Sequence, residues 1–171
     1  MDIVDKETRS RMMAAVKGRN TQYEIAIRKR LFSKGFRYRI DDKKLPGRPD
    51  IVLPKYKVII FVNGCFWHYH ECHLSRIPKS RSEWWQSKLE GNRQRDARNL
   101  EALAAAGWRV LVIWECSFRR PGVCREEELD RISEIASGFI QSDAEYLEIY
   151  FDVIDRSKHF DLQERKGRST Q

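Results

Sequence analysis

Two apolar segments and the long helical segment between them constrain the fold most strongly. Residues 58–62, VIIFV, are apolar in succession, which is typical of a central strand covered on both faces. Residues 82–106 have the spacing of one helix despite an internal glycine, and a second apolar strand follows at 108–114. A strand, a helix of this length and another strand form a crossover between parallel strands. We therefore expect one α/β domain with a mixed central sheet flanked by helices.

The remaining segments extend this sheet and cover it. Residues 21–34 are predicted to form a helix, because Thr21 can cap it and Glu24 occupies the capping-box position. The other expected elements are strands at 36–40 and 50–53, a helix at about 126–140 and an apolar stretch at 146–151. The predicted organisation is a basic N-terminal arm at 1–20, a single domain at 21–155 and a polar tail at 156–171.

Charge is distributed unevenly along the chain. The total is 33 Lys and Arg against 25 Asp and Glu, a formal charge of +8. Residues 1–124 hold 26 basic and 13 acidic side chains, whereas residues 125–155 hold 2 and 10. The basic part favours a polyanion such as a phosphate backbone as partner. No apolar run is long enough for a membrane span and the N-terminus lacks a secretory apolar core, so we expect a cytoplasmic protein.

Cysteine and histidine gather in one segment, GCFWHYHECH at 64–73. Four cysteines in 171 residues are too few for a disulfide scaffold, whereas thiolate and imidazole ligands together suit tetrahedral Zn²⁺. If the segment is extended, His68, His70 and Cys72 lie on one side of it. A fourth ligand must come from elsewhere, and we prefer Cys116, just past the second apolar strand, to its rival Cys124. The predicted structural zinc site consists of Cys65, His70, Cys72 and Cys116.

A second group of polar residues begins with the motif PGRPD, which places Asp50 at the mouth of a strand. Nuclease folds of the restriction-endonuclease type have Pro-Asp at this point and Glu/Asp-x-Lys on the next strand. Here the next strand ends in Val62, Asn63 and Gly64 and has neither residue. A metal-dependent hydrolase without them needs another proton acceptor. His68 is the candidate, and Asp96 on the long helix could orient it through the other ring nitrogen.

Taken together, these motifs resemble the very short patch repair (Vsr) family of mismatch endonucleases. The resemblance covers about residues 4–120 in the family's order and spacing, and GCFWHxHxC is its most specific part. The matching segments are DKETRSRMM at 5–13, TxxE at 21–24, LPGRPDIVL at 45–53, VIIFVNGCFWHYHEC at 58–72, RSEWW at 81–85, NRQRD at 92–96 and GWRVLVIWEC at 107–116. On these residues the chain is identified as a member of the family.

The resemblance implies a restriction-endonuclease-like fold with a structural Zn²⁺ and a Mg²⁺-dependent active site. Its activity would be a strand nick 5′ of the thymine in a T·G mismatch, the lesion left by deamination of 5-methylcytosine. Asp50 is then the metal-binding carboxylate, and the backbone carbonyl of Val62 is a second metal ligand. The family has Thr where this chain has Val62, which is harmless if only the carbonyl is used. His68 is the catalytic base, Asp96 its partner and Glu24 an accessory acidic residue.

The same resemblance assigns residues to DNA. Phe66, Trp67 and Trp85 would form an aromatic wedge that inserts beside the mismatch from the major groove, with Met13 inserting from the opposite groove. The N-terminal arm is expected to become ordered on DNA. The basic residues expected to contact phosphates are Arg9, Arg11, Lys17, Arg19, Arg93, Arg95 and Arg98.

The expected partner is double-stranded DNA containing a T·G mismatch, with mismatch-repair proteins as further partners. We expect a bacterial, nucleoid-associated monomer that does not bind membranes. One alternative is a nuclease of the same fold that acts on another mismatch or a modified base. Another is a zinc-stabilised DNA-binding module without catalysis. The sequence leaves open the bases flanking the mismatch and the role of the acidic segment 125–155.

Overall fold

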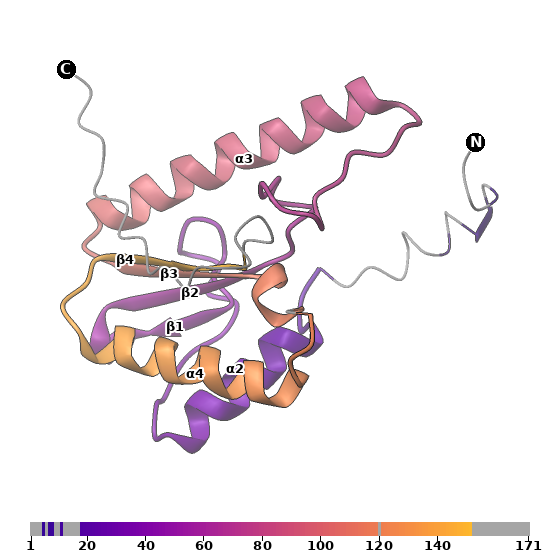
Figure 1. The fold of residues 1–171 in the computed structure, drawn as a ribbon. Coiled ribbons are helices and arrows are strands. Elements are labelled where there is room, and N and C mark those ends of the chain that lie inside the picture. Colours follow the sequence, from indigo (N-terminus) through magenta and orange to yellow (C-terminus); the bar gives the residue numbers. More distant parts are fainter. Residues whose placement is uncertain (1–4, 6, 9–10, 12–17, 120, 152–171) are drawn as a thin grey trace.

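The computed structural model describes residues 5, 7, 8, 11, 18–119 and 121–151. Its centre is a four-stranded sheet in the order β1-β2-β3-β4 (Figure 1). β1 (Ile51–Leu53) runs antiparallel to β2 (Val58–Asn63), β3 (Arg109–Trp114) runs parallel to β2, and β4 (Tyr146–Ile149) runs parallel to β3. Short 3₁₀ turns, η1 (Pro54–Tyr56) and η2 (Glu115–Phe118), follow β1 and β3. The predicted mixed sheet is confirmed.

Helices cover both faces of this sheet (Figure 1). α3 (Ser82–Ala105) connects β2 to β3 and lies over one face, while α2 (Gln22–Ser33) and α4 (Arg125–Gln141) lie over the other. α2 begins as the sequence predicts, because Thr21 Oγ1 accepts from the Glu24 N–H at 3.3 Å and the Glu24 carboxylate accepts from the Thr21 N–H at 3.2 Å. This reciprocal cap satisfies two main-chain donors that the first turn leaves free.

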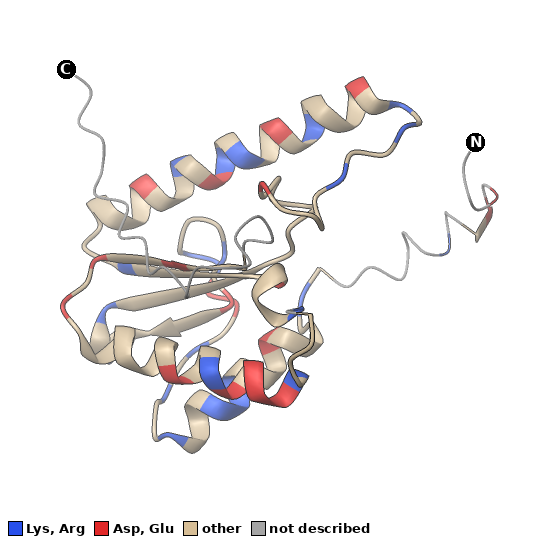
Figure 2. Ribbon diagram, in the orientation of Figure 1, with Lys and Arg blue, Asp and Glu red and all other residues tan. Residues whose placement is uncertain are grey.

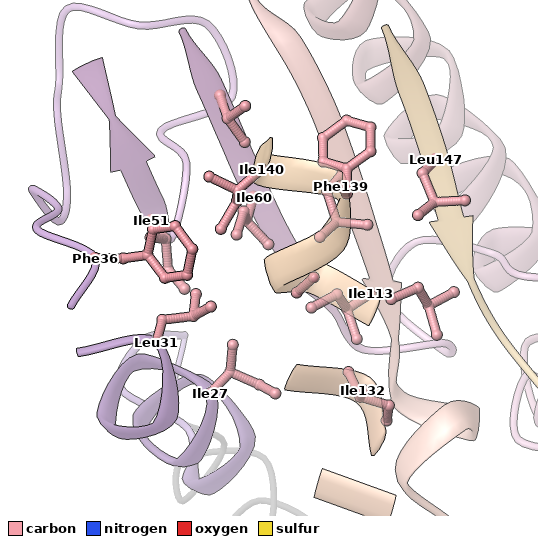
Figure 3. Packing of buried hydrophobic residues seen from close by; sticks show 14 of the residues in the cluster. Ile27, Leu31, Phe36, Ile51, Ile60, Ile113, Ile132, Phe139, Ile140 and Leu147 are labelled. Carbon is pink, nitrogen blue, oxygen red and sulfur yellow. The ribbon is translucent and has the colours of Figure 1, made fainter. Parts of the chain in front are cut away.

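The central strands pack against helices on both of their faces. On the face of α2 and α4, Ile60 packs in one buried cluster with Ile27 and Ile132 (Figure 3). On the opposite face, the neighbouring Ile59 packs in a second cluster with Leu103 of α3. Successive side chains of a strand point to opposite faces, so a strand between two layers needs apolar residues in succession. Val58, Ile59 and Ile60 are buried as the sequence predicts, whereas Phe61 and Val62 at the end of the strand are only partly buried.

The acidic C-terminal helix is paired with basic side chains of α2. Arg30 contacts Glu126 at 2.6 Å and Asp130 at 2.7 Å, and Lys34 contacts Glu134 at 2.5 Å. We call these five residues the acidic interface; the blue and red segments of the two helices lie side by side in Figure 2. The acid side chains are about 70% exposed, so each pair contributes no more than about 1 kcal/mol. Three of the ten acidic residues of segment 125–155 thus offset charge on α2.

Arg109, at the start of β3, ties the end of α4 to the sheet. Its guanidinium donates to five main-chain carbonyls at 2.5 to 3.4 Å, those of Tyr56, Phe139, Ile140, Ser142 and Ala144. Carbonyls at a helix C-terminus lack partners within the helix, and a cation is favourable there. One side chain therefore positions the end of α4 and the start of β4.

Residues 36–40 differ from the expectation of a strand. They form one isolated bridge, in which Arg39 and Val52 exchange main-chain hydrogen bonds of 2.8 and 2.9 Å. Asp41 has φ +53°, so the chain turns away directly after this pair. The predicted tail at 156–171 and most of the predicted arm lie outside the described residues. Among the helices that the structure describes, none has the length and apolar character needed to cross a membrane.

Candidate active site and metal centre

Asp50 lies directly before β1 and points toward the end of β2. Its Oδ2 accepts a hydrogen bond from the main-chain N–H of Val62 at 2.7 Å. Burial raises the pKa of Asp50 to about 6, and the Val62 N–H opposes this effect. Glu24 raises the pKa further, whereas Arg28 and His68 lower it. A carboxylate beside the main chain of a strand end offers the oxygen ligands that Mg²⁺ prefers.

Glu24 is held beside Asp50 by several donors. It is 3% exposed, and its Oε2 accepts from Arg28 Nη2 at 2.9 Å and from the Asn20 N–H at 2.9 Å. Arg28 Nη2 also donates to the main-chain carbonyl of Asp50 at 3.1 Å. Through this guanidinium, the start of α2 and the start of β1 form one buried polar group.

His68 and Asp96 come from different elements and form a hydrogen-bonded pair. His68 is in the loop after β2 and Asp96 is in the middle of α3, yet His68 Nδ1 and Asp96 Oδ2 are 2.6 Å apart. An ionised carboxylate only accepts, so Nδ1 carries the proton in this bond and the second ring nitrogen, Nε2, is the one that can accept. Asp50 binds the main chain at Val62 and His68 lies in the loop that follows this strand end, so the carboxylate and the pair lie near the same edge of the sheet.

The loop that carries His68 is folded into turns, so the expectation of an extended segment is wrong. The His68 N–H donates to the Gly64 carbonyl at 3.2 Å and the His70 N–H to the Cys65 carbonyl at 3.0 Å. Tyr69, between the two histidines, has φ +52°. As a result His68 and His70 do not share one side: His68 meets Asp96, whereas His70 meets the cysteines.

Cys65, His70, Cys72 and Cys116 form a compact cluster. One potential ligand atom from each lies within 4.8 Å of the other three. Cys65 follows β2 and Cys116 follows β3, and parallel strands bring their carboxyl ends to the same edge of a sheet. The preference for Cys116 over Cys124 agrees with this geometry, because Cys124 is exposed at the N-cap of α4.

The environment of these cysteines favours thiolate at Cys116 only, since burial raises the pKa of Cys72. The pKa of Cys116 lies below its ordinary value, chiefly because the Cys65 thiol donates to its sulfur, with a further contribution from His70. The same bond with Cys116 raises the pKa of Cys65. The main-chain N–H of Phe151 also donates to Cys116 Sγ at 3.4 Å. Metal ligation by cysteine needs thiolate, so a cation at this cluster would relieve the conflict between neighbouring thiols.

The three aromatic residues of the expected wedge are in mutual contact. The ring centroid of Phe66 lies 5.1 Å from that of Trp67 and 5.3 Å from that of Trp85, both nearly edge to face. All three are partly exposed, which excludes the interpretation that they are ordinary core residues. Asn92 fixes the loop from α3, because its Nδ2 donates to the Trp67 carbonyl at 2.9 Å. Trp84, which the sequence reasoning missed, is 45% exposed and packs on Trp85.

The basic residues assigned to DNA divide into two groups. Arg93, Arg95 and Arg98 are exposed on α3. Arg11 and Arg19 are exposed near the N-terminus, and Arg19 contacts Asp41 at 2.5 Å. The expectations for three further residues fall outside the described part of the chain, namely Arg9, Met13 and Lys17.

A cavity of about 490 Å³ extends from the site between α3 and the sheet. His68 and Asp96 line it on one side, and Trp114 and Glu148 line it deeper in the sheet. Trp114 stacks on His70 with ring centroids 4.3 Å apart and donates from Nε1 to Glu148 at 3.1 Å. Trp114 thus supports a residue of the metal centre.

Arg28 and Trp114 are two further residues of the site that sequence reasoning missed. Arg28 follows Glu24 by four positions, which is the spacing of neighbours on a helix face and was the available indication. Trp114 precedes Cys116 by two positions and ends an apolar strand, so its pattern indicated a core residue.

Comparison with known proteins gives consistent results. A family model described as "DNA mismatch endonuclease Vsr" matches residues 1–74. "Type II nicking enzyme V.XorIIP" of Xanthomonas oryzae pv. oryzae is 49% identical over 117 residues, which cover 68% of this chain and 86% of that protein. "DNA mismatch endonuclease Vsr" of Escherichia coli is 41% identical over 138 residues, which cover 80% of this chain and 88% of that protein. "Type II nicking enzyme V.NmeAIP" of Neisseria meningitidis is 42% identical over 134 residues, which cover 78% of this chain and 96% of that protein.

Proposed function

The chain belongs to the Vsr family of DNA mismatch endonucleases, and on this premise we propose that it nicks one strand 5′ of the thymine in a T·G mismatch, with Mg²⁺ as cofactor. The protein is a DNA-nicking endonuclease of mismatch repair. The observation that carries the catalytic assignment is the convergence of Asp50 with the hydrogen-bonded pair of His68 and Asp96.

Asp50 and the main-chain carbonyl of Val62 are the proposed Mg²⁺ ligands. The donor set fits, because Mg²⁺ takes oxygen ligands and uses one or two carboxylates while it retains several waters. The 2.7 Å bond from the Val62 N–H holds the carboxylate at this strand end. When bound, Mg²⁺ would neutralise charge on the scissile phosphate and assist departure of the leaving oxygen.

His68 is the proposed general base. Asp96 holds the proton on Nδ1, so Nε2 can accept a proton from the attacking water. Asp96 also stabilises the imidazolium that forms and fixes the orientation of the ring. Glu24 acts beside Asp50 as an accessory acidic residue.

Cys65, His70, Cys72 and Cys116 are proposed to hold a structural Zn²⁺. Three cysteines and one histidine are a common tetrahedral donor set, and the separation of at most 4.8 Å between ligand atoms is compatible with one ion. The loop 64–73 carries ligands of this ion together with His68, so the ion would fix the position of the catalytic base.

Phe66, Trp67 and Trp85 are proposed to insert beside the mismatched pair, together with Met13. Unstacking costs a few kcal/mol and costs least at a mismatch, so insertion itself favours the lesion. Arg93, Arg95 and Arg98, with the basic residues of the N-terminal arm, would contact phosphates and contribute affinity rather than sequence preference.

We further propose a restriction-endonuclease-like fold, action as a monomer on nucleoid DNA and contact with mismatch-repair proteins. The central mixed sheet with a carboxylate at the mouth of β1 supports the fold assignment.

The test uses end-labelled duplexes that differ in one base pair, T·G or T·A. With Mg²⁺ we expect one nick 5′ of the mismatched thymine and an intact T·A duplex, and EDTA should stop the reaction. Equal cleavage of both duplexes would contradict the mismatch preference. A panel of other mismatches and modified bases tests the alternative substrate, since relatives are named as type II nicking enzymes. Duplex binding without cleavage in any divalent cation would contradict the catalytic assignment.

A further inference from the structure

Arg28 is a buried charged residue to which the proposed mechanism gives no role. It is 9% exposed and lies on the face of α2 that turns toward the sheet, next to the fully buried Ile27 and one helical turn from Leu31. Isoleucine and leucine fill the neighbouring buried positions of α2 without a desolvation cost. A guanidinium at such a position loses hydration and needs compensating partners.

The partners of Arg28 belong to three separate segments. Nη2 contacts Glu24 Oε2 at 2.9 Å and the main-chain carbonyl of Asp50 at 3.1 Å, while Nη1 contacts the side-chain oxygen of Asn20 at 2.6 Å. Asn20 is the last residue before the capped start of α2, so it is the point at which the N-terminal arm joins the domain. One planar group thus joins the arm, the accessory carboxylate and the strand that presents the metal-binding carboxylate.

The guanidinium is not fully satisfied by these contacts. Its Nε is buried and has no hydrogen-bond partner among the residues that the structure describes. A buried polar atom without a partner costs about 1 to 3 kcal/mol, so the arrangement is not the most stable way to fill this space. This cost favours a functional reason for the arginine over a purely structural one.

We propose that Arg28 is a positioning residue of the nicking reaction, which fixes the Asp50 main chain and Glu24 relative to each other and to the base of the N-terminal arm. The proposal rests on the proposed role of Asp50 as the Mg²⁺ ligand. The Asp50 side chain is restrained on one side by the Val62 N–H, and Arg28 restrains its main chain on the other. Arg28 also balances the charge of Glu24, which otherwise repels the carboxylate of Asp50.

The test compares Arg28→Met with Arg30→Met. Both remove an arginine of α2 that pairs with carboxylates, but Arg30 belongs to the acidic interface. Single-turnover nicking of a T·G duplex is measured as Mg²⁺ is titrated, and duplex affinity is measured separately in Ca²⁺. For Arg28→Met we expect the maximal rate to fall about 10²-fold and the half-saturating Mg²⁺ concentration to rise several-fold, with duplex affinity within about threefold. Arg30→Met should match the wild-type protein in all three quantities.

Arg28→Lys separates charge from geometry. A single ammonium cannot reach three acceptors as a planar fork does, so we expect a rate between those of the wild-type protein and Arg28→Met. Equal rates and equal Mg²⁺ dependence for Arg28→Met and Arg30→Met, both folded by circular dichroism, would overturn the proposal.

Arg28→Met leaves the buried Glu24 without its cation, which could unfold the protein. A second comparison therefore tests the proposal without an unpaired buried charge. Glu24→Gln/Arg28→Met removes the charge together with its partner, and it is compared with Glu24→Gln alone. The double variant should be slower than Glu24→Gln, because the contacts to Asp50 and Asn20 are also lost; equal rates would contradict the proposal. Asp50→Asn separates the two assignments: if it nicks normally, the Mg²⁺ assignment fails, whereas if it is inactive, the Arg28 variants test positioning alone.

Discussion

The basic residues of the helices on the two faces of the sheet differ in the partners that they contact. On α2, Arg30 and Lys34 each contact carboxylates of α4 within 2.7 Å. On α3, Arg93 contacts the highly exposed Glu71 at 3.2 Å. Arg95 and Arg98 are exposed and donate instead to the amide oxygen of Asn92 and the main-chain carbonyl of Gln94. Two helices that are both rich in basic residues thus differ in the charge that they offer to a phosphate. A count of net charge therefore does not locate a DNA-binding face, whereas the partners of each cation do.

The largest effect is expected when two cysteines are compared, one in the Cys/His cluster after β3 and one at the start of α4. Cys116→Ser removes a proposed ligand from the Cys/His cluster, whereas Cys124→Ser changes an exposed residue at the start of α4. Binding of structural zinc contributes many kcal/mol to folding, so loss of about 4 kcal/mol should lower the melting temperature by about 10 °C. Metal content, by atomic emission, should fall well below one equivalent in Cys116→Ser and stay unchanged in Cys124→Ser. The opposite result would make Cys124 the fourth ligand.

The next comparison concerns the nicking rate and two aspartates, Asp96, which contacts His68, and Asp130, which contacts Arg30. Asp96→Asn replaces the acceptor of His68 Nδ1, and Asp130→Asn replaces an acceptor of Arg30. Loss of the carboxylate allows the wrong tautomer of His68 and no longer stabilises its protonated form, so the nicking rate should fall about 10² to 10³-fold. Asp130→Asn should retain the wild-type rate. Similar rates for the two variants in single-turnover assays would show that Asp96 has no role in proton transfer.

The smallest effect is expected on duplex affinity, when basic residues of α3 and of α2 are replaced. Arg95→Ala/Arg98→Ala should weaken duplex binding about tenfold near physiological salt and reduce the dependence of log affinity on log salt by about 2, because two phosphate contacts are lost. Arg30→Ala/Lys34→Ala removes the same charge but should leave affinity and salt slope unchanged. Fluorescence anisotropy across a salt series measures both quantities. Equal salt slopes for the two double variants would contradict the distinction between the layers.

Local patterns predicted much of this structure because they depend on neighbouring residues alone. The capping box at Thr21 and Glu24 begins α2 as expected, and the VIIFV segment forms the covered strand β2. The choice of Cys116 also follows from a simple rule, because parallel strands end at the same edge of the sheet.

The features that sequence reasoning missed depend on tertiary contacts. The alternation of side chains failed in the loop after β2, where the left-handed conformation of Tyr69 directs His68 and His70 to different partners. Arg28 contacts Asp50, which is 22 positions away, and only the packing of α2 against the sheet brings them together. The expected strand at 36–40 was reduced to one bridge because the chain turns at Asp41.

The contacts of Arg109 also determine how the molecule can open. Its guanidinium binds carbonyls from η1, from the last turn of α4 and from the connection to β4. If the last turn of α4 or the connection to β4 separates, Arg109 must give up two hydrogen bonds at once, so the end of α4 does not fray independently. Local unfolding is therefore cooperative where the end of α4, the connection to β4 and the start of β3 meet.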